Sequence, residues 1–207
     1  MIQAANTSNK WEEWLRKNLD NNPIVFISGG TDSTLALYLT CHYISKNNLD
    51  YAVQPCFIYN KIRNVGSLPL QRAKLILDYI KDRFNDVKIK DLYIYYYHSK
   101  QPGELKAKYY NKAANILNCK CKIYGGISKP NHFPQHGDDR NSKEYKEESL
   151  LGYYDKRDEY KFYIEFNLQE IFPFTMSCTT AKYPPCKKCW MCQEKKWGFG
   201  VFDGDNI

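Results

Sequence analysis

The stretch IVFISGGTDSTLALYL, residues 24–39, decides the fold. Its four apolar residues at the start predict a buried strand, and the run from Ser33 onward predicts a helix. Between the two, Gly29 and Gly30 permit a tight turn and leave room for a ligand to approach the backbone. Backbone N–H groups converge at such a turn, and the helix N-terminus adds a partial positive charge. The stretch therefore predicts a strand–turn–helix unit that binds an anion such as phosphate.

The turn is neither a Walker A loop, because it lacks the terminal lysine, nor a Gly-x-Gly-x-x-Gly loop. Its hydroxyl groups can donate hydrogen bonds to phosphate, whereas the carboxylate of Asp32 repels phosphate and is better suited to hold Mg²⁺ or to fix the loop. An ordinary turn in which Asp32 or Ser33 caps the helix is the alternative. The candidate nucleotide-binding residues are Ile27, Ser28, Gly29, Gly30, Thr31, Asp32, Ser33 and Thr34.

Four cysteines near the C-terminus form the second informative pattern. They are Cys178, Cys186, Cys189 and Cys192, and the last three are separated by two residues each. Cys-x2-Cys pairs form tight turns whose thiolates reach one tetrahedral Zn²⁺. Four thiolates without a histidine predict a closed, structural zinc site. Disulfides, an iron–sulfur cluster and free thiols remain as alternatives.

The other cysteines do not form such a pattern. Cys41 and Cys56 lie in apolar stretches, which predicts core positions. Cys119 and Cys121 lie just before a predicted strand and are interpreted either as core residues or as a reactive pair.

Strand and helix patterns alternate along the chain. Beyond the first unit, strands are predicted at 51–59, 92–97 and 122–124, and helices at 70–84 and 104–117. This alternation predicts an α/β fold, a parallel sheet with helices on both faces. We assign residues 1–175 to this domain and residues 176–207 to a C-terminal cysteine element. An earlier helix around Trp11 and Leu15 is expected to cover the sheet or a second subunit in a homodimer.

Ligands of such folds bind outside the carboxyl ends of the strands. Residues that follow strands are therefore candidates for binding the second substrate. Residues 127–150 are polar and long for a connection, which predicts either a functional lid or a solvated loop. The candidate substrate-binding residues at this edge are Tyr59, Asn60, Gly125, Gly126 and Asn131.

Composition limits the other classes of function. No apolar run approaches the ~20 residues that cross a membrane, and no signal-peptide pattern begins the chain. Eight cysteines without a secretory signal predict a reducing cytoplasm, and the many Tyr, Asn, Lys and Ile indicate an AT-rich genome, that of a virus or of a small bacterium. The net charge of +7 comes from evenly spread Lys and Arg, which disfavours nucleic acid as a partner.

The string Ser-Gly-Gly-x-Asp-Ser at 28–33 resembles the PP-loop of the ATP pyrophosphatase superfamily. Two further segments, 155–159 and 175–178, together with the four cysteines, resemble the 7-cyano-7-deazaguanine synthase branch of that superfamily. In that branch an Asp-Lys-x-x-Glu helix precedes a Thr-x-Ser-Cys element. The chain departs from the branch at Tyr59-Asn60, where a Tyr-Gly-Gln run is usual, and its cysteine spacing is one residue shorter.

The resemblance implies an adenine nucleotide alpha hydrolase-like, Rossmann-like fold that uses ATP, Mg²⁺ and Zn²⁺. It implies that a 7-carboxy-7-deazaguanine carboxylate is adenylated, that ammonia displaces AMP, and that a second adenylation gives the nitrile. It also implies Asp32 and Lys156 as catalytic residues, with Lys156 contacting phosphate or adenylate; a solvent-facing helix lysine is the alternative. No protein nucleophile is needed.

Two other functions are compatible with the sequence. A PP-loop sulfurtransferase acting on tRNA would carry persulfide sulfur on Cys119 or Cys121. A nucleic-acid-binding zinc-knuckle protein would bind RNA or DNA with strong salt dependence and would consume no ATP.

Overall fold

A five-stranded parallel sheet lies at the centre of the computed structural model, which describes residues 10–61, 67–98, 106–128, 141–178, 184–205 and 207. Strand β1 pairs with β2 on one side and with β5 on the other, and β2 continues to β3 and to β4. Every pairing is parallel, as the alternating pattern predicts. The strands are β1 Ile24–Phe26, β2 Ala52–Asn60, β3 Lys88–Ile89, β4 Tyr93–Tyr97 and β5 Lys122–Ile123.

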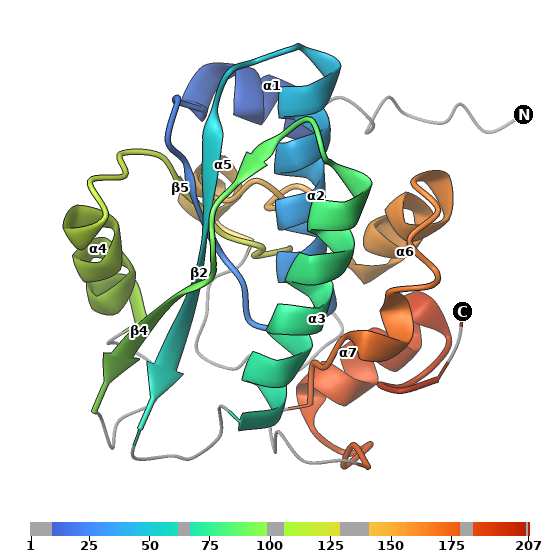
Figure 1. Cartoon of the computed structure of the whole chain (residues 1–207). Helices are drawn as coiled ribbons and strands as arrows, with labels where there is room; N and C mark the ends of the chain where they lie inside the picture. Colours follow the sequence, from blue (N-terminus) through green and yellow to red (C-terminus); the bar gives the residue numbers. More distant parts are fainter. Residues whose placement is uncertain (1–9, 62–66, 99–105, 129–140, 179–183, 206) are drawn as a thin grey trace, which may run out of the picture.

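Helices cover both faces of the sheet, which confirms the predicted α/β class (Figure 1). Helix α4 lies on one face, and α2 and α3 lie on the other. The helices are α1 Lys10–Asn18, α2 Thr31–Lys46, α3 Ser67–Arg83, α4 Lys106–Ile116, α5 Lys143–Glu148, α6 Lys156–Glu165 and α7 Trp190–Phe199, with a short 3₁₀ helix η2 at Phe172–Phe174.

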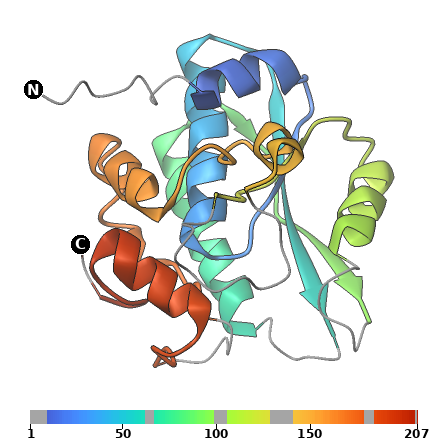
Figure 2. The same ribbon diagram turned by 180° about the vertical axis from the view of Figure 1, so that it is seen from behind.

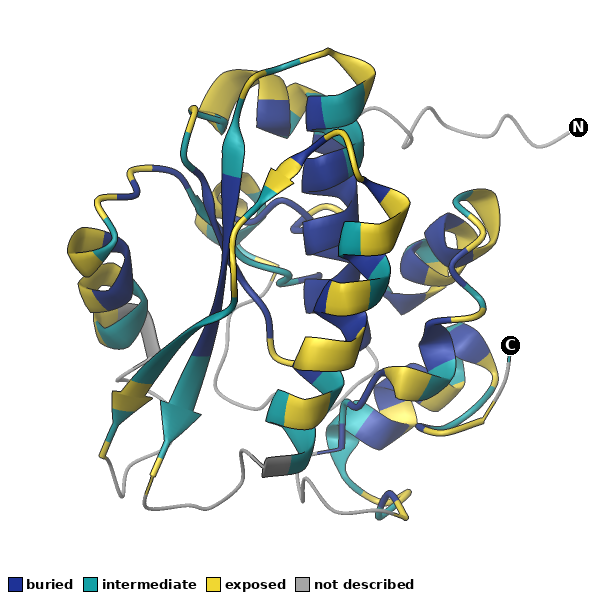
Figure 3. Cartoon of the chain, in the orientation of Figure 1, coloured by how far each residue is buried: buried dark blue, intermediate teal, exposed yellow. Residues whose placement is uncertain are grey.

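Strand β1 is buried on both faces, which explains its unbroken apolar sequence. Ile24 and Phe26 pack with residues of α4, whereas Val25 packs in the larger core that contains α2 and α3. Helix α2 is buried along most of its length and forms the centre of that larger core (Figure 3). The loop between β1 and α2 is therefore held between two well-packed elements.

Helix α1 packs against its own chain. Trp11 and Leu15 are buried in the larger core, and the backbone N–H of Trp11 donates to the hydroxyl of Tyr154 at 3.0 Å. Helix α1 therefore covers the core of its own chain, and the homodimer stays a prediction.

Some elements differ from the sequence-based expectation. Helix α2 begins at Thr31 rather than at Ser33, so the turn between β1 and α2 is shorter than expected. The two-residue strand β3 was not predicted, since its pattern is too short to be periodic. Helix α5 lies inside the segment 127–150 that was predicted as a loop, with Ser142 as its N-cap, and Leu150 beyond it is buried.

The C-terminal segment packs on the same side of the molecule as α6. Figures 1 and 2 show α7 beside α6, and a side chain at Gly198 of α7 would collide with Lys156 of α6. The boundary at residue 175 stays a prediction. Within the described residues, no helix combines the length and the apolar character needed to cross a membrane.

Candidate functional site

The turn after β1 adopts a backbone conformation that requires glycine at one position. Gly29 has φ +81°, and a Cβ there would lie 2.7 Å from the carbonyl oxygen of Pro69 in α3. Gly30 is extended and forms the N-cap position of α2. The first glycine therefore lets the chain turn tightly between the sheet and α3.

Side-chain hydroxyls fix this turn. Ser33 Oγ accepts a hydrogen bond from the backbone N–H of Ser28 at 3.0 Å, and the two serine hydroxyls lie 3.0 Å apart. Thr34 Oγ1 donates to the carbonyl oxygen of Gly30 at 2.8 Å. The turn is thus organised by its own residues.

The first turn of α2 has no side-chain cap among the residues that the structure describes. Asp32 and Ser33 lie inside the first helical turn, so the alternative in which one of them caps the helix is wrong. Uncapped N–H groups at a helix start carry a partial positive charge and are suited to an anion.

A buried cluster of charges lies directly behind this helix start. Lys156, the first residue of α6, is 2% exposed and forms an ion pair with Asp32 and another, at 2.6 Å, with Glu159 Oε2. Its Nζ also donates to Thr31 Oγ1 at 2.7 Å. The alternative of Lys156 as a solvent-facing helix lysine is therefore wrong.

Asp32 is the exposed member of this cluster, with 32% of its side chain accessible. Burial raises the pKa of the Asp32 carboxyl, but Lys156 outweighs this effect and lowers the pKa overall. Burial also works to lower the pKa of Lys156, while Asp32, Glu159 and Glu194 outweigh it and raise the pKa. Asp32 and Lys156 are therefore held as a charged pair.

Glu159 is the least satisfied member. It is fully buried, and its Oε1 atom has no hydrogen-bond partner among the described residues. Burial, together with the negative charge of Asp32, raises the pKa of Glu159 to about 8. The nearby hydroxyl of Tyr163 donates to the carbonyl oxygen of Thr31 at 3.1 Å, which anchors α2 to α6.

Residues that follow β5 and residues at the end of β2 lie at the same edge of the sheet. Gly125 packs against the start of α2, where a Cβ would lie 2.5 Å from the carbonyl oxygen of Asp32. Gly126 faces α5, where a side chain would collide with Tyr145. Tyr59 and Asn60 end strand β2, and the Tyr59 ring lies 5.4 Å from that of Tyr96. The candidate residue Asn131 lies outside the described residues.

The four C-terminal cysteines come together. The Sγ atoms of Cys178, Cys186, Cys189 and Cys192 all lie within 4.8 Å of one another. Zn–S bonds of about 2.3 Å place tetrahedral sulfurs about 3.8 Å apart, close to the 4.0 Å between Cys186 and Cys192. The group can therefore hold a metal ion.

Backbone geometry supports these sulfurs. The N–H of Cys186 donates to Cys178 Sγ, and the N–H of Cys189 donates to Cys186 Sγ, both at 3.3 Å. Lys187, with φ 56°, makes the tight turn between two of the cysteines. Cys189 is the N-cap residue of α7, so the positive end of that helix favours thiolates.

Cys119 and Cys121 lie at the opposite end of the sheet from the turn. The carbonyl of Cys121 accepts from the N–H of Ile24, the first residue of β1, at 2.9 Å. Both are buried, and burial raises the pKa of each thiol, to about 12 for Cys121. Neither is a reactive thiol at the candidate site.

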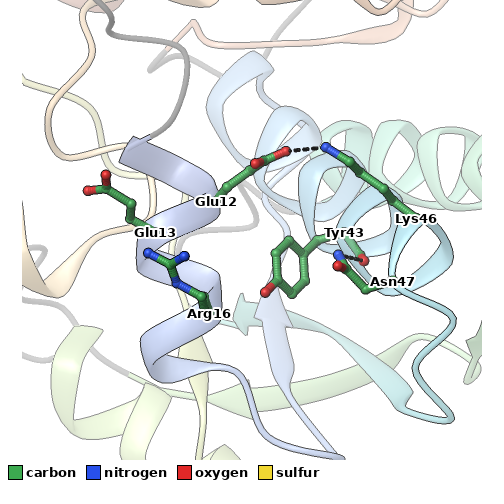
Figure 4. A pocket seen from close by; sticks show the side chains of 6 residues that line it. All are labelled: Glu12, Glu13, Arg16, Tyr43, Lys46 and Asn47. Atoms are coloured by element: carbon green, nitrogen blue, oxygen red, sulfur yellow. Dashed lines mark hydrogen bonds and ion pairs between the residues drawn. The ribbon is translucent and has the colours of Figure 1, made fainter.

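A shallow depression also lies away from the turn, between α1 and the last turn of α2 (Figure 4). Its lining side chains are polar and either exposed or half-buried, and Glu12 forms an ion pair with Lys46 across it at 2.8 Å. Its position at the far end of α2 separates it from the uncapped helix start.

Sequence reasoning missed several residues of the site. Glu159 was quoted within the Asp-Lys-x-x-Glu segment but was given no role; it stands three residues after Lys156 on the same face of α6, and this spacing was the available signal. Lys195 and Asp203 form a buried ion pair at 2.5 Å. Nothing in the local sequence marks that pair, because its partners come together only through tertiary packing.

Together, fold and site define an α/β protein in which a parallel sheet carries a glycine turn, an uncapped helix start and a nearby cysteine group. No protein-family model and no curated protein matches the chain. Among solved structures, it is similar to a U34-tRNA thiolase from Methanococcus maripaludis that carries a 4Fe–4S cluster, at 15% identity and a TM-score of 0.40. The match covers 58% of this chain and 45% of the thiolase, so the chain spans less than half of that protein.

Proposed function

We propose that the chain is an ATP-dependent enzyme that cleaves ATP to AMP and pyrophosphate. The uncapped start of α2 behind Gly29 and Gly30 is the observation that carries this proposal. It provides N–H donors and a positive helix end for the leaving pyrophosphate. The absence of a lysine in the loop favours binding of a pyrophosphate group over transfer of the γ-phosphate.

The charged pair behind the turn explains how phosphates and a carboxylate share one site. The three N–H donors of Lys156 already have three acceptors, on Asp32, Glu159 and Thr31. Lys156 therefore acts as a positioning residue that neutralises Asp32, rather than as a direct phosphate ligand. Because a third of Asp32 is exposed beside the turn, its carboxylate can help to hold Mg²⁺. When bound, that ion neutralises charge that develops on the leaving pyrophosphate.

We infer 7-carboxy-7-deazaguanine as the acceptor. Its carboxylate oxygen attacks the α-phosphorus and the bond to pyrophosphate breaks. Ammonia then attacks the acyl carbon, loses a proton and expels AMP, which gives the amide. The amide oxygen then attacks the α-phosphorus of a second ATP and expels pyrophosphate, and loss of both amide protons together with AMP, which carries the oxygen away, gives the nitrile. The support is the sequence resemblance at 28–33, 155–159 and 175–192, and the position of the site at the carboxyl edge, where Tyr59 and Gly125 also lie.

We infer Zn²⁺ as the metal of the cysteine group, in a structural role. Four sulfurs within 4.8 Å suit a single ion, whereas the thiolates of a four-iron cluster lie around a larger body. Iron and acid-labile sulfide in the purified protein, instead of zinc, would contradict this assignment.

A sulfurtransferase that uses Cys119 or Cys121 receives less support, because both lie at the amino end of the strands. A nucleic-acid-binding knuckle protein would leave the pair of Asp32 with the buried Lys156 without a purpose. A tRNA substrate remains an outcome of the experiment below.

Phosphorus NMR of the products tests the proposal. Purified protein is incubated with ATP, Mg²⁺, ammonium and either 7-carboxy-7-deazaguanine or an unmodified tRNA with a sulfide donor. We expect AMP and pyrophosphate with the deazaguanine, and a loss of turnover of about 100-fold or more in Asp32→Asn. Asp50→Asn, at an exposed ion pair, is the matched control and should keep full turnover. ADP and phosphate as products would refute the proposal.

A further inference from the structure

One short segment touches both the nucleotide turn and the cysteine group. The backbone N–H of Met176 donates to the carbonyl oxygen of Gly29 at 2.6 Å. A Cβ on Gly30 would lie 3.3 Å from the carbonyl oxygen of Met176. Two residues later, Cys178 contributes the first sulfur of the cysteine group. Residues 175–178 therefore pack against the turn and also provide the first sulfur of the cysteine group.

A buried ion pair holds this segment from its other side. Asp203 Oδ2 accepts hydrogen bonds from the N–H groups of Ser177 and Cys178, at 2.9 and 2.8 Å. Its Oδ1 accepts from Lys195 Nζ at 2.5 Å, and Lys195 also donates to Thr175 Oγ1 at 2.9 Å. Both charged side chains are almost completely buried, so the bonds are shielded from water.

Helix α7 links the same two sites a second time. Cys192 lies in its first turn, and Lys195 follows three residues later. Glu194, next to Lys195, is buried and acts electrostatically on Lys156 behind the turn. A helix that supplies a metal ligand therefore also supplies charge to the nucleotide site.

We propose that Asp203 and Lys195 are positioning residues that couple metal binding by the cysteines to nucleotide binding at the turn. The proposal rests on the proposed function, because it requires that both ligands bind. A metal held by Cys178 orders residues 175–178, and their bond to Gly29 then fixes the turn before the nucleotide arrives. Without the metal, nucleotide binding must provide that ordering. Coupling between binding sites is reciprocal, so the nucleotide must tighten metal binding by the same factor.

Two binding titrations test the coupling without any turnover. Calorimetry measures the Kd of the non-cleavable α,β-methylene-ATP with Mg²⁺, for zinc-loaded and zinc-stripped protein. A competing zinc chelator measures the zinc Kd with and without that analogue. We expect zinc to tighten nucleotide binding by about 5-fold or more, and the nucleotide to tighten zinc binding by an equal factor.

Asp203→Asn should keep the four cysteines and the bound zinc. The factor by which zinc tightens nucleotide binding should, however, fall toward one in this variant. Asp205→Asn is the matched control, because the Asp205 carboxylate is exposed and accepts from the N–H of Phe202; its coupling should match the unmodified protein. Lys195→Gln gives the same test should Asp203→Asn fail to fold. A factor of one in the unmodified protein, or full coupling in the variants, would overturn the proposal. Failure of the analogue to bind the zinc-loaded protein would instead contradict the proposed function.

Discussion

The two ends of the parallel sheet carry charge in opposite ways. At the carboxyl end, Lys156 and Glu159 are buried within the site around Asp32. Around the amino end, Lys88 pairs with Asp50, and both side chains are largely exposed. Burying a charge costs several kcal/mol, whereas an exposed ion pair contributes about 0–1 kcal/mol. Stability alone therefore does not explain why charged groups are buried at the carboxyl end. A binding site that needs charges at fixed positions does explain it.

Substitution of a cysteine in the metal group and of one at the amino end of the sheet should give the largest difference. Cys189→Ser at the metal group should weaken zinc binding by more than about 100-fold and unfold the cysteine element, because metal binding and local folding are coupled. Cys119→Ser, at the other end of the sheet, should retain zinc and turnover. Elemental analysis, together with limited proteolysis of the C-terminal segment, measures both variants. Full zinc content in Cys189→Ser would contradict a site formed by the four cysteines.

Substitution of a lysine at each end should give the second largest difference, which is measured in the free energy of unfolding. Lys156→Met leaves the Asp32 carboxylate without its cation and should lower the free energy of unfolding by about 3–5 kcal/mol. Lys46→Met removes an ion pair to Glu12 whose lysine is 54% exposed, and should cost no more than about 1 kcal/mol. Urea unfolding followed by circular dichroism compares the two variants. Equal losses of unfolding free energy would mean that the buried cluster contributes no more to stability than a surface ion pair does.

The pH dependence of stability tests the buried carboxyl group of the cluster. The pKa of Glu159 is raised from 4.5 to about 8, so between these values the folded protein holds a proton that the unfolded chain has released. The free energy of unfolding should therefore fall as pH rises through this window. Glu159→Gln mimics the protonated form and should remove this part of the fall. Identical pH profiles for the two proteins would show that Glu159 does not titrate in that range.

The sequence predicted those features that are encoded locally. Alternating strand and helix patterns gave the parallel sheet, because each element buries an apolar face of its own. Cys-x2-Cys spacing gave the cysteine group, because two intervening residues bring neighbouring sulfurs together. Gly29 was singled out as a turn residue, and its positive φ agrees.

Features that depend on tertiary packing could not be predicted in the same way. Lys156 and Asp32 are separated by more than a hundred residues, and nothing in the α6 sequence tells whether a lysine faces water or the start of α2. Asp203 and Lys195 meet around a segment that neither of them adjoins in sequence. Helix α5 could not be predicted because its residues are almost all polar, and none of them is buried.

Transfer of oxygen-18 from the acceptor carboxylate to AMP is the most direct test of adenylation at the turn. The carboxylate of 7-carboxy-7-deazaguanine is labelled with oxygen-18, and the AMP formed with ATP and ammonium is analysed by mass spectrometry. If the turn binds pyrophosphate while the carboxylate attacks the α-phosphorus, AMP must carry one labelled oxygen. Unlabelled AMP, or label in inorganic phosphate released with ADP, would contradict the account.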